Sequence, residues 1–319
     1  MTTPSLSICI PAYNRPRWLG RALSSILTTS PQQQQQVEII VSDDSTIAEC
    51  QQVTHKLLAN WQGSHRYHRN SPSLGMAANW NQCIHLASGN FLLILHDDDY
   101  LEPKAVEQIL AVVQKNHEYK ALLFGVNVVT PEERVQKQQQ FYQQQYLPQK
   151  DAIKQILFDS SFVRFPGMLL HRDVFEQIGY FDELVGGIAD IHLWVRVFEH
   201  YGVLCLPVIT ANYTVHSQAL TMDMFKMPVV NELLALFDWA ENHQLLDVKT
   251  LEYCKANYFH QFVLAGTVRY IRLGKFRQAH SVLTLLNSLN IKHNLAIRKW
   301  KLIRWILSCF LKPVAILGS

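Results

Sequence analysis

Three consecutive carboxylates, Asp97, Asp98 and Asp99, follow an apolar run in the stretch LLILHDDDYLEP. Like charges this close repel, so the cluster costs stability unless a positive group lies beside it. Carboxylates at the end of a strand are suitable ligands for a hard divalent cation that keeps some of its water and also binds a phosphate. Such an ion would offset the repulsion and stabilise charge on a diphosphate leaving group. The alternative is a solvated acidic turn, because surface loops often contain such runs.

A second acidic pair, Asp43 and Asp44, follows the apolar run VEIIVS in the same way. The elements that must position both clusters alternate along the chain. Apolar runs predict strands at 6–12, 37–42, 91–95 and 203–208, with a possible edge strand at 65–69, and helical spacing predicts helices at about 18–27, 46–60, 75–88 and 173–179. This alternation predicts an α/β fold with a doubly wound, mostly parallel, Rossmann-like sheet. Ligands bind beyond the carboxyl ends of such strands, where both clusters would lie.

The composition argues against several other classes of protein. Hydrophobic residues make up 48% of the 319 residues, enough for one large domain with an appendage. The six cysteines are scattered without a CxxC pair, which argues against a disulfide framework or structural zinc and indicates a reducing compartment. The first residues lack the basic start and apolar core of a signal peptide, and no apolar run approaches the ~18–20 residues of a membrane span. We therefore expect a cytoplasmic protein. The glutamine tracts at 32–36 and 138–145 predict solvated loops.

The C-terminal region is basic and helical in pattern. Residues 253–319 contain eleven Lys and Arg and no Asp or Glu, so a net charge of +3 overall leaves −8 for residues 1–252. The segment 297–313 predicts an amphipathic helix with one apolar face formed by Trp300, Ile303, Ile306, Leu307 and Phe310. A basic, tryptophan-bearing helix is typical of binding to an anionic membrane surface. A terminal helix that packs on the core is the alternative, and no motif for nucleic acid is present.

Four blocks of sequence carry a resemblance to a known family. They are IPAYNRPRWLGRALSSIL, VEIIVSDDST, NSPSLGMAANWNQCIHLASGNFLLILHDDDYLEP and IGYFDELVGGIADIHLWVR. In this order and spacing, over roughly residues 5–220, the chain resembles the family 2 glycosyltransferases. The resemblance implies the GT-A fold, a nucleotide-sugar donor, a divalent metal (Mn²⁺ or Mg²⁺) and inversion at the anomeric carbon.

The resemblance also implies roles for residues that bind the donor. Asp44 is similar to the residue that accepts the ring N–H of the base, which favours uracil or thymine, and Asp43 would support that loop. Capping of the following helix is the alternative for this acidic pair. A glycine at a helix start permits close approach of a nucleotide or forms a plain turn. The remaining matched positions lie in the first nucleotide-binding turn and along the donor: Pro11, Ala12, Tyr13, Asn14, Gly75, Met76 and Asn79.

The metal and the catalytic base are implied in the same way. Asp99 is the first choice as metal ligand and Asp98 the second, shared with the ribose, and Asp97 completes a literal Asp-x-Asp. An alignment on Tyr100 instead places His96 at the first acidic position. His216, in YTVHSQALT, resembles a residue that reaches the metal or diphosphate; a structural histidine is the alternative.

Asp190 matches the family's catalytic carboxylate, which takes the acceptor's proton. Ala189 stands where many relatives have Glu, and a simple N-cap is the alternative for Asp190.

These observations predict a GT-A catalytic domain at 1–222 and a helical, basic region at 223–319. The expected activity is metal-dependent, inverting transfer from a nucleotide sugar (UDP or TDP favoured) to a hydroxyl of a glycan or lipid-linked acceptor in cell-surface polysaccharide synthesis. The expected location is the cytoplasm, at the inner face of the plasma membrane if the helical region binds lipid. A catalytically idle nucleotide-binding relative and a Mg²⁺-dependent phosphoryl-transfer enzyme are the alternatives. No GxxxxGK[ST] loop supports the latter.

Overall fold

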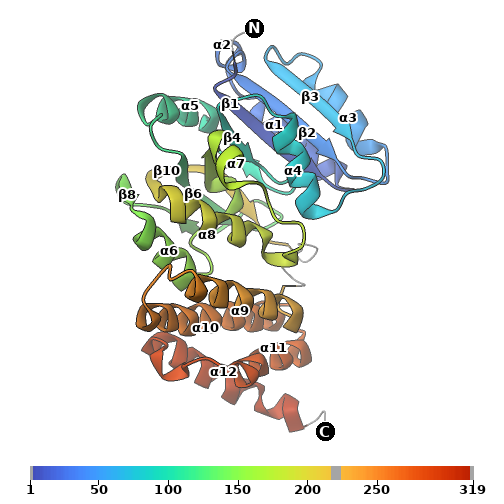
Figure 1. The fold of residues 1–319 in the computed structure, drawn as a ribbon. Coiled ribbons are helices and arrows are strands. Elements are labelled where there is room, and N and C mark those ends of the chain that lie inside the picture. The colour runs from blue at the N-terminus through green and yellow to red at the C-terminus, as the bar shows by residue number, and fades with distance from the viewer. Residues whose placement is uncertain (1–2, 217–223, 317–319) are drawn as a thin grey trace. The chain divides into compact units, whose positions relative to one another are not determined.

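The computed structural model describes residues 3–216 and 224–316, which form two compact units (Figure 1). Unit 1 consists of Met1–Gln149, Val163–Leu184 and His192–His216, and unit 2 consists of Lys150–Phe162, Val185–Ile191 and Ser217–Ser319. The predicted domain boundary between residues 222 and 223 lies outside the described residues and stays a prediction.

Unit 1 contains a mixed sheet with the strand order β3-β2-β1-β4-β9-β6-β10-β5, in which β7 also pairs with β6 and β8 with β10. Its strands are β1 (Leu6–Ala12), β2 (Val37–Asp43), β3 (Ser64–Arg69), β4 (Phe91–Ile94), β5 (Tyr100–Leu101), β6 (Ala121–Val129), β7 (Val135–Gln139), β8 (Gln145–Leu147), β9 (Met168–His171) and β10 (Val203–Thr214).

The first four strands are parallel to one another, and β6 and β10 form a second parallel pair. β1 lies between β2 and β4 and is parallel to both, and β3 is the edge strand beyond β2. Ala12 pairs with Asp43, and Cys9 pairs with Ile94. Because these strands run in one direction, the turns that follow β1, β2 and β4 lie at the same edge of the sheet. This arrangement confirms the predicted α/β class and the predicted positions of both acidic clusters at strand ends.

Helices cover both faces of this part of the sheet. Alternate residues of β1, such as Ile8 and Ile10, share one core with buried side chains of α1, α3 and α5. Cys9 points to the opposite face, where its Sγ contacts the carbonyl of Cys83 in α4. This alternation is the two-residue period of a strand that is buried on both faces. The helices contributed by unit 1 are α1 (Pro16–Ile26), α2 (Pro31–Gln34), α3 (Glu49–Leu58), α4 (Met76–Leu86), α5 (Ala105–Lys115), the 3₁₀ helix η1 (Phe165–Gly167) and α7 (Asp173–Ile178).

The rest of the sheet differs in detail from the sequence-based expectation. β9 is antiparallel to β4 and β6, so the sheet is mixed in this half. The two glutamine tracts are not simple loops, because they contribute to α2 and to the outer strands β7 and β8. The predicted last strand, 203–208, continues to Thr214, because β10 pairs with β6 beyond irregularities in the register. The extension contains strand-favouring residues such as Ile209, Thr210 and Tyr213, so the predicted end of the strand was placed too early.

Unit 2 is helical, as the periodicity of the C-terminal region predicts. α10 packs against α11 and α12, and Figure 1 shows α9 to α12 as the orange and red helices. No helix in the described ranges is long and apolar enough to cross a membrane. α8 (Ala189–Tyr201) begins in unit 2 and continues into unit 1. The other helices of unit 2 are α6 (Gln149–Phe158), η2 (Gly186–Ile188), α9 (Met227–Asn242), α10 (Val248–Arg272), α11 (Phe276–Ser288), η4 (His293–Leu295) and α12 (Arg298–Ile316).

Candidate active site

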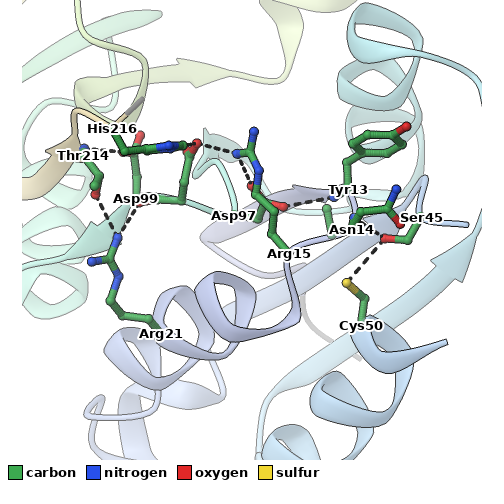
Figure 2. A network of polar contacts seen from close by, with 12 residues as sticks. Tyr13, Asn14, Arg15, Arg21, Ser45, Cys50, Asp97, Asp99, Thr214 and His216 are labelled. Atoms are coloured by element: carbon green, nitrogen blue, oxygen red, sulfur yellow. Dashed lines mark hydrogen bonds and ion pairs between the residues drawn. The ribbon is translucent and has the colours of Figure 1, made fainter. Parts of the chain in front are cut away.

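The acidic turn after β4 is tied to the turn after β1. The Tyr13 backbone N–H donates to Asp97 Oδ2 at 3.0 Å, and Arg15 Nη1 donates to Asp97 Oδ1 at 3.2 Å (Figure 2). Asp97 is 4% exposed. Burial raises its pKa to about 7, and the Asp98 carboxylate adds to the rise. The contacts of Asp97 therefore join the turn after β4 to the turn after β1. Asp98 and Asp99 are the two carboxylates that remain for the candidate site.

Arg15 is the positive group that the acidic cluster requires. Its Nη1 lies 2.5 Å from Asp98 Oδ2, and the same oxygen lies 3.0 Å from His216 Nε2. The His216 ring stacks on Trp18, with 5.0 Å between ring centroids. Burial alone would raise the pKa of Asp98, but the hydrogen bond with His216 and the nearby positive charges outweigh it and lower that pKa. Asp98 is therefore held ionised between a guanidinium and an imidazole.

Arg21 supports the turn from the opposite side. Its Nη2 donates to the Asp98 carbonyl at 2.5 Å and to Thr214 Oγ1 at 2.8 Å, and its guanidinium lies over the rings of Trp18 and Tyr100. Figure 2 shows Arg15 and Arg21 on either side of the acidic turn. Thr214, two residues before His216, thereby accepts a hydrogen bond from an arginine of α1.

Two buried ligand atoms beside Asp98 have no hydrogen-bond partner among the described residues: His96 Nε2 and Asp99 Oδ2. The other oxygen of Asp99 accepts the Thr214 backbone N–H at 2.8 Å. His96, Asp98 and Asp99 each offer one ligand atom, and these atoms lie within 4.8 Å of one another. Buried polar atoms without partners are rare in native structures and indicate an absent ion or water. The donor set therefore fits a divalent cation.

The protonation states of the cluster agree with this fit. Burial lowers the pKa of His96 to about 4, so its imidazole is neutral at pH 7 and offers a lone pair. The His96 ring packs against Trp80 and Phe165, with centroid distances of 5.3 Å and 4.2 Å. Burial, followed by the Asp98 charge, raises the pKa of Asp99. A cation at this position would reverse that rise, because it favours the ionised carboxylate.

The second acidic pair anchors the loops around it. Asp43 Oδ1 accepts the Ser45 N–H, and Asp43 Oδ2 accepts the Tyr67 hydroxyl at 2.6 Å. Asp44 is 3% exposed and accepts four hydrogen bonds from the segment 70–75, at 2.6–3.0 Å. The helix-capping alternative is wrong, because α3 begins at Glu49 and has Ala48 at its N-cap without a side-chain cap.

The donor-side residues meet around the ends of β1 and β2. Asn79 is buried, accepts from Asn70 at 2.9 Å and donates to the Ala12 carbonyl at 3.4 Å. Pro11 is the buried residue before Ala12. Gly75 has φ +88° at the N-cap of α4, a conformation that favours glycine, and Met76 is the first residue of that helix.

The turn after β1 continues this surface. Tyr13 is 52% exposed and so is not core packing. Asn14 donates its N–H to Ser45 Oγ at 2.7 Å and accepts the Thr46 N–H at 3.0 Å. The turns after β1 and β2 are thereby joined (Figure 2).

Asp190 lies in the first turn of α8, within unit 2. Because the helix begins at Ala189, Asp190 is inside it rather than at the N-cap, and its Oδ1 accepts the Ile191 N–H at 2.8 Å. An acidic residue at this end of a helix is stabilised by the helix dipole. Its catalytic role stays a prediction.

The sequence-based prediction of the site did not include Arg15, Arg21 or Trp18. A signal was present for Arg15, because it follows directly on the four-residue turn matched to the family and supplies a cation near a cluster that needs one. Arg21 and Trp18 are spaced like ordinary helix residues. Only the packing of α1 against the acidic turn shows that Arg21 and Trp18 are parts of the site.

The family model of glycosyl transferase family 2 matches residues 7–179, which is more than half of the chain. A Campylobacter jejuni protein named GalNAc(5)-diNAcBac-PP-undecaprenol beta-1,3-glucosyltransferase is 27% identical over 199 residues, 61% of this chain and 60% of that protein. An uncharacterized protein of Mycobacterium tuberculosis is 35% identical over 106 residues, 33% of this chain and 31% of that protein. The chain thus covers less than two thirds of the length of these relatives.

Solved structures agree on the fold. Residues 1–349 of S. aureus TarS, in complex with UDP-GlcNAc, match with a TM-score of 0.63 at 14% identity, covering 99% of this chain and 92% of that one. The Pyrobaculum calidifontis mannosyltransferase PcManGT, in complex with GDP-Man and Mn²⁺, matches with a TM-score of 0.56 at 13% identity, covering 99% and 88%. The chain therefore belongs to glycosyl transferase family 2 and has the GT-A fold.

Proposed function

We propose that this family 2 protein is a metal-dependent, inverting glycosyltransferase, and that it transfers a sugar from a UDP- or TDP-linked donor to a hydroxyl group. The observation that carries the proposal is the cluster of His96, Asp98 and Asp99, in which two buried ligand atoms lack partners. A nucleotide diphosphate leaving group develops negative charge as the glycosidic bond breaks. A bound cation would supply the stabilisation of that charge.

The proposed metal ligands are Asp98, Asp99 and His216, with His96 added by the geometry. Asp98 belongs to two groups of possible ligands. It lies in the cluster with His96 and Asp99, and it hydrogen-bonds to His216. An imidazole ligand is poorly suited to Mg²⁺, which takes oxygen ligands. Mn²⁺ is therefore the preferred candidate, and Asp97 is proposed as a second-sphere residue that orients the turn.

The proposed base-binding residue is Asp44, supported by Asp43. Its carboxylate already accepts four hydrogen bonds from the segment 70–75, so a contact with the ring N–H of uracil or thymine would replace one of them. Tyr13 is exposed beside the same strand ends and offers a face for stacking. The proposed wall along the donor consists of Pro11, Ala12, Asn14, Gly75, Met76 and Asn79.

Asp190 is the proposed general base, which would take the proton from the acceptor hydroxyl as the hydroxyl attacks the anomeric carbon. Its test is the variant Asp190→Asn, which removes the base and keeps the size of the side chain. We expect turnover to fall by about 100-fold or more while the dissociation constant for the nucleotide stays unchanged. Equal turnover in the variant would assign the proton transfer to another group.

The proposed acceptor is a glycan or a lipid-linked glycan in cell-surface polysaccharide synthesis. Support comes from the names of relatives, among them the GalNAc(5)-diNAcBac-PP-undecaprenol beta-1,3-glucosyltransferase of Campylobacter jejuni and the abequosyltransferase RfbV of Salmonella typhimurium. A lipid-linked acceptor would place the reaction at the inner face of the plasma membrane.

Calorimetric titration of UDP, dTDP and GDP, with and without Mn²⁺ or Mg²⁺, tests the donor and metal proposals together. We expect UDP or dTDP to bind only with metal. A ligand at 100 times its dissociation constant should also add about 2.7 kcal/mol to the free energy of unfolding. Asp98→Asn should abolish the metal-dependent binding. The exposed, matched control Asp151→Asn should retain it.

Manganese binding without nucleotide tests the role of His96 separately. The electron paramagnetic resonance signal of free Mn²⁺ decreases when the ion binds. His96→Asn should weaken Mn²⁺ binding by about tenfold, whereas His171→Asn, at a partly exposed histidine paired with Asp173, should leave it unchanged. Metal-independent UDP binding by the wild type would contradict the metal proposal and leave the family assignment intact.

A further inference from the structure

Helix α12 has two apolar stripes, and one of them is covered by its own unit. Ile303, Leu307 and Leu311 repeat at helical spacing, and together with Trp300 they pack into a cluster with residues of α10 and α11. Leu311 is fully buried there. The predicted single face is therefore wrong in part, because Trp300, Ile303 and Leu307 belong to this packed stripe rather than to an outward one.

The second stripe of α12 is exposed. Leu302, Trp305, Ile306 and Phe310 follow the i, i+3, i+4, i+8 pattern of one helix face, and they are 58%, 65%, 49% and 55% exposed. Phe276, at the start of α11, is 41% exposed, and its ring lies 6.2 Å from that of Phe310. These five side chains form a continuous apolar surface, which we name the α12 patch. Contiguous exposed apolar residues of this size mark an interaction site.

The charge around the α12 patch has one sign. Residues 253–319 contain no Asp or Glu, so every charged side chain on α11 and α12 is a cation. Exposed basic residues lie at the start of α11 and on the first turn of α12: Lys275, Arg277, Arg298, Lys299 and Lys301. An apolar partner that also carries negative charge would complement this surface.

We propose that the α12 patch binds an anionic phospholipid bilayer, with α12 lying in the plane of the interface. Trp305 and Phe310 would enter the boundary between head groups and acyl chains, and the exposed basic residues would contact lipid phosphates. A second copy of this chain is a poorer partner, because two such faces would place like charges against each other. The inference rests on unit 2 alone and does not depend on the donor or metal proposals.

Contact between the α12 patch and a bilayer can be followed with a probe at Cys309. Cys309 is exposed on the same stripe, whereas Cys9, Cys50, Cys83, Cys205 and Cys254 are buried. A polarity-sensitive fluorophore attached to Cys309 of the full chain should shift to shorter wavelength with vesicles of phosphatidylglycerol and phosphatidylcholine. Co-sedimentation of unlabelled protein should give partitioning about tenfold weaker for pure phosphatidylcholine, and weaker for mixed vesicles at high salt.

Variants separate the apolar and electrostatic contributions. Trp305→Asp combined with Ile306→Asp, and separately Lys299→Glu combined with Lys301→Glu, should each lower partitioning into the mixed vesicles by about tenfold or more. Val248→Asp is the matched control, because Val248 is 57% exposed at the start of α10, outside the patch. It should bind like the wild type, and thermal unfolding of each variant should remain cooperative.

Three results would overturn the proposal. Wild-type protein that fails to bind mixed vesicles excludes a bilayer as partner. Equal partitioning into charged and neutral vesicles removes the role of the cations. A dimer in light scattering that dissociates with Trp305→Asp and Ile306→Asp, without vesicle binding, assigns the α12 patch to self-association. None of these measurements uses a nucleotide, so their failure leaves the proposed transfer reaction untouched.

Discussion

At the scale of single residues, Arg15 supplies the positive charge that offsets the repulsion between the carboxylates of the acidic turn. One guanidinium nitrogen lies within hydrogen-bond distance of both Asp97 and Asp98, at 3.2 Å and 2.5 Å. Asp98 also belongs to the cluster that fits a cation. Arg15 and a metal ion therefore offer alternative positive charges to the same carboxylate.

The variant Arg15→Gln tests this balance. Without metal, we expect the free energy of unfolding to fall by roughly 1–3 kcal/mol, because part-buried carboxylates lose their counter-ion. Adding Mn²⁺ should restore more stability to the variant than it gives to the wild type. Chemical denaturation with and without Mn²⁺ measures both quantities. The exposed neighbour Arg17→Gln serves as control, and an equal loss there would contradict the assignment.

Gly75 gives a second prediction at the residue scale. Its φ is +88°, and a Cβ added there would meet nothing within 4 Å, so only backbone strain opposes a side chain. Gly75→Ala should lower the free energy of unfolding by about 1–3 kcal/mol. Gly20, inside α1, has space for an ordinary contact with Val53, and Gly20→Ala should keep or raise stability. The same loss at both positions would show that strain is not the cause.

At the scale of elements, Asp44 joins the end of β2 to the segment that leads into α4. Ser73 Oγ and the Leu74 and Gly75 N–H groups all donate to its carboxylate, as does Asn70 Nδ2. Burial by itself would raise the pKa of Asp44, but these hydrogen bonds outweigh burial and lower it. The ionised form is therefore the form that holds the loop.

This depressed pKa predicts a pH dependence. The contribution of Asp44 to stability is fully present above its unfolded pKa of about 4 and is lost as pH falls through the lower folded value. Asp44→Asn should lower the free energy of unfolding by about 2–3 kcal/mol near neutral pH. The difference from wild type should shrink below pH of about 4. Denaturation curves across this range check the sign, and a difference that grows in acid would contradict it.

At the scale of the whole molecule, unit 2 is assembled from three separate segments of chain. Gln261 of α10 donates to Asp159 at 2.5 Å, and the Tyr253 ring stacks on Phe158 at 5.5 Å. Glu232 of α9 accepts the Gly187 N–H at 3.0 Å. The short segments 150–162 and 185–191 therefore depend on helices that follow much later in the sequence.

Truncation after residue 222 tests this dependence. The fragment keeps the two short segments and loses the partners of Phe158, Asp159 and Gly187. We expect it to be less stable than the full chain by roughly 3 kcal/mol or more, because buried side chains of α6 become exposed. Removing only residues 298–319 retains those partners and should cost less. A fragment that unfolds at the midpoint of the full chain would show the segments to be self-sufficient.

The sequence by itself determined the strands β1, β2 and β4 and the acidic clusters after two of them. Buried parallel strands read as apolar runs, and their carboxyl ends must share one edge of the sheet. The family could be identified for the same reason, since its motifs are local stretches at these ends. The helical C-terminal region followed from local periodicity.

Only the tertiary structure decided which groups complete these local features. Arg15 became a counter-ion and Arg21 a donor to the Asp98 carbonyl because the start of the chain through α1 packs beside the acidic turn. The sequence left open whether His96 or Asp97 takes the first acidic position, and the turn brings His96 to Asp98 and Asp99. α12 is apolar on two adjoining stripes, and its own periodicity cannot tell which stripe a neighbouring helix will cover. Contacts between residues distant in the chain carry this information, and they exist only once the chain is folded.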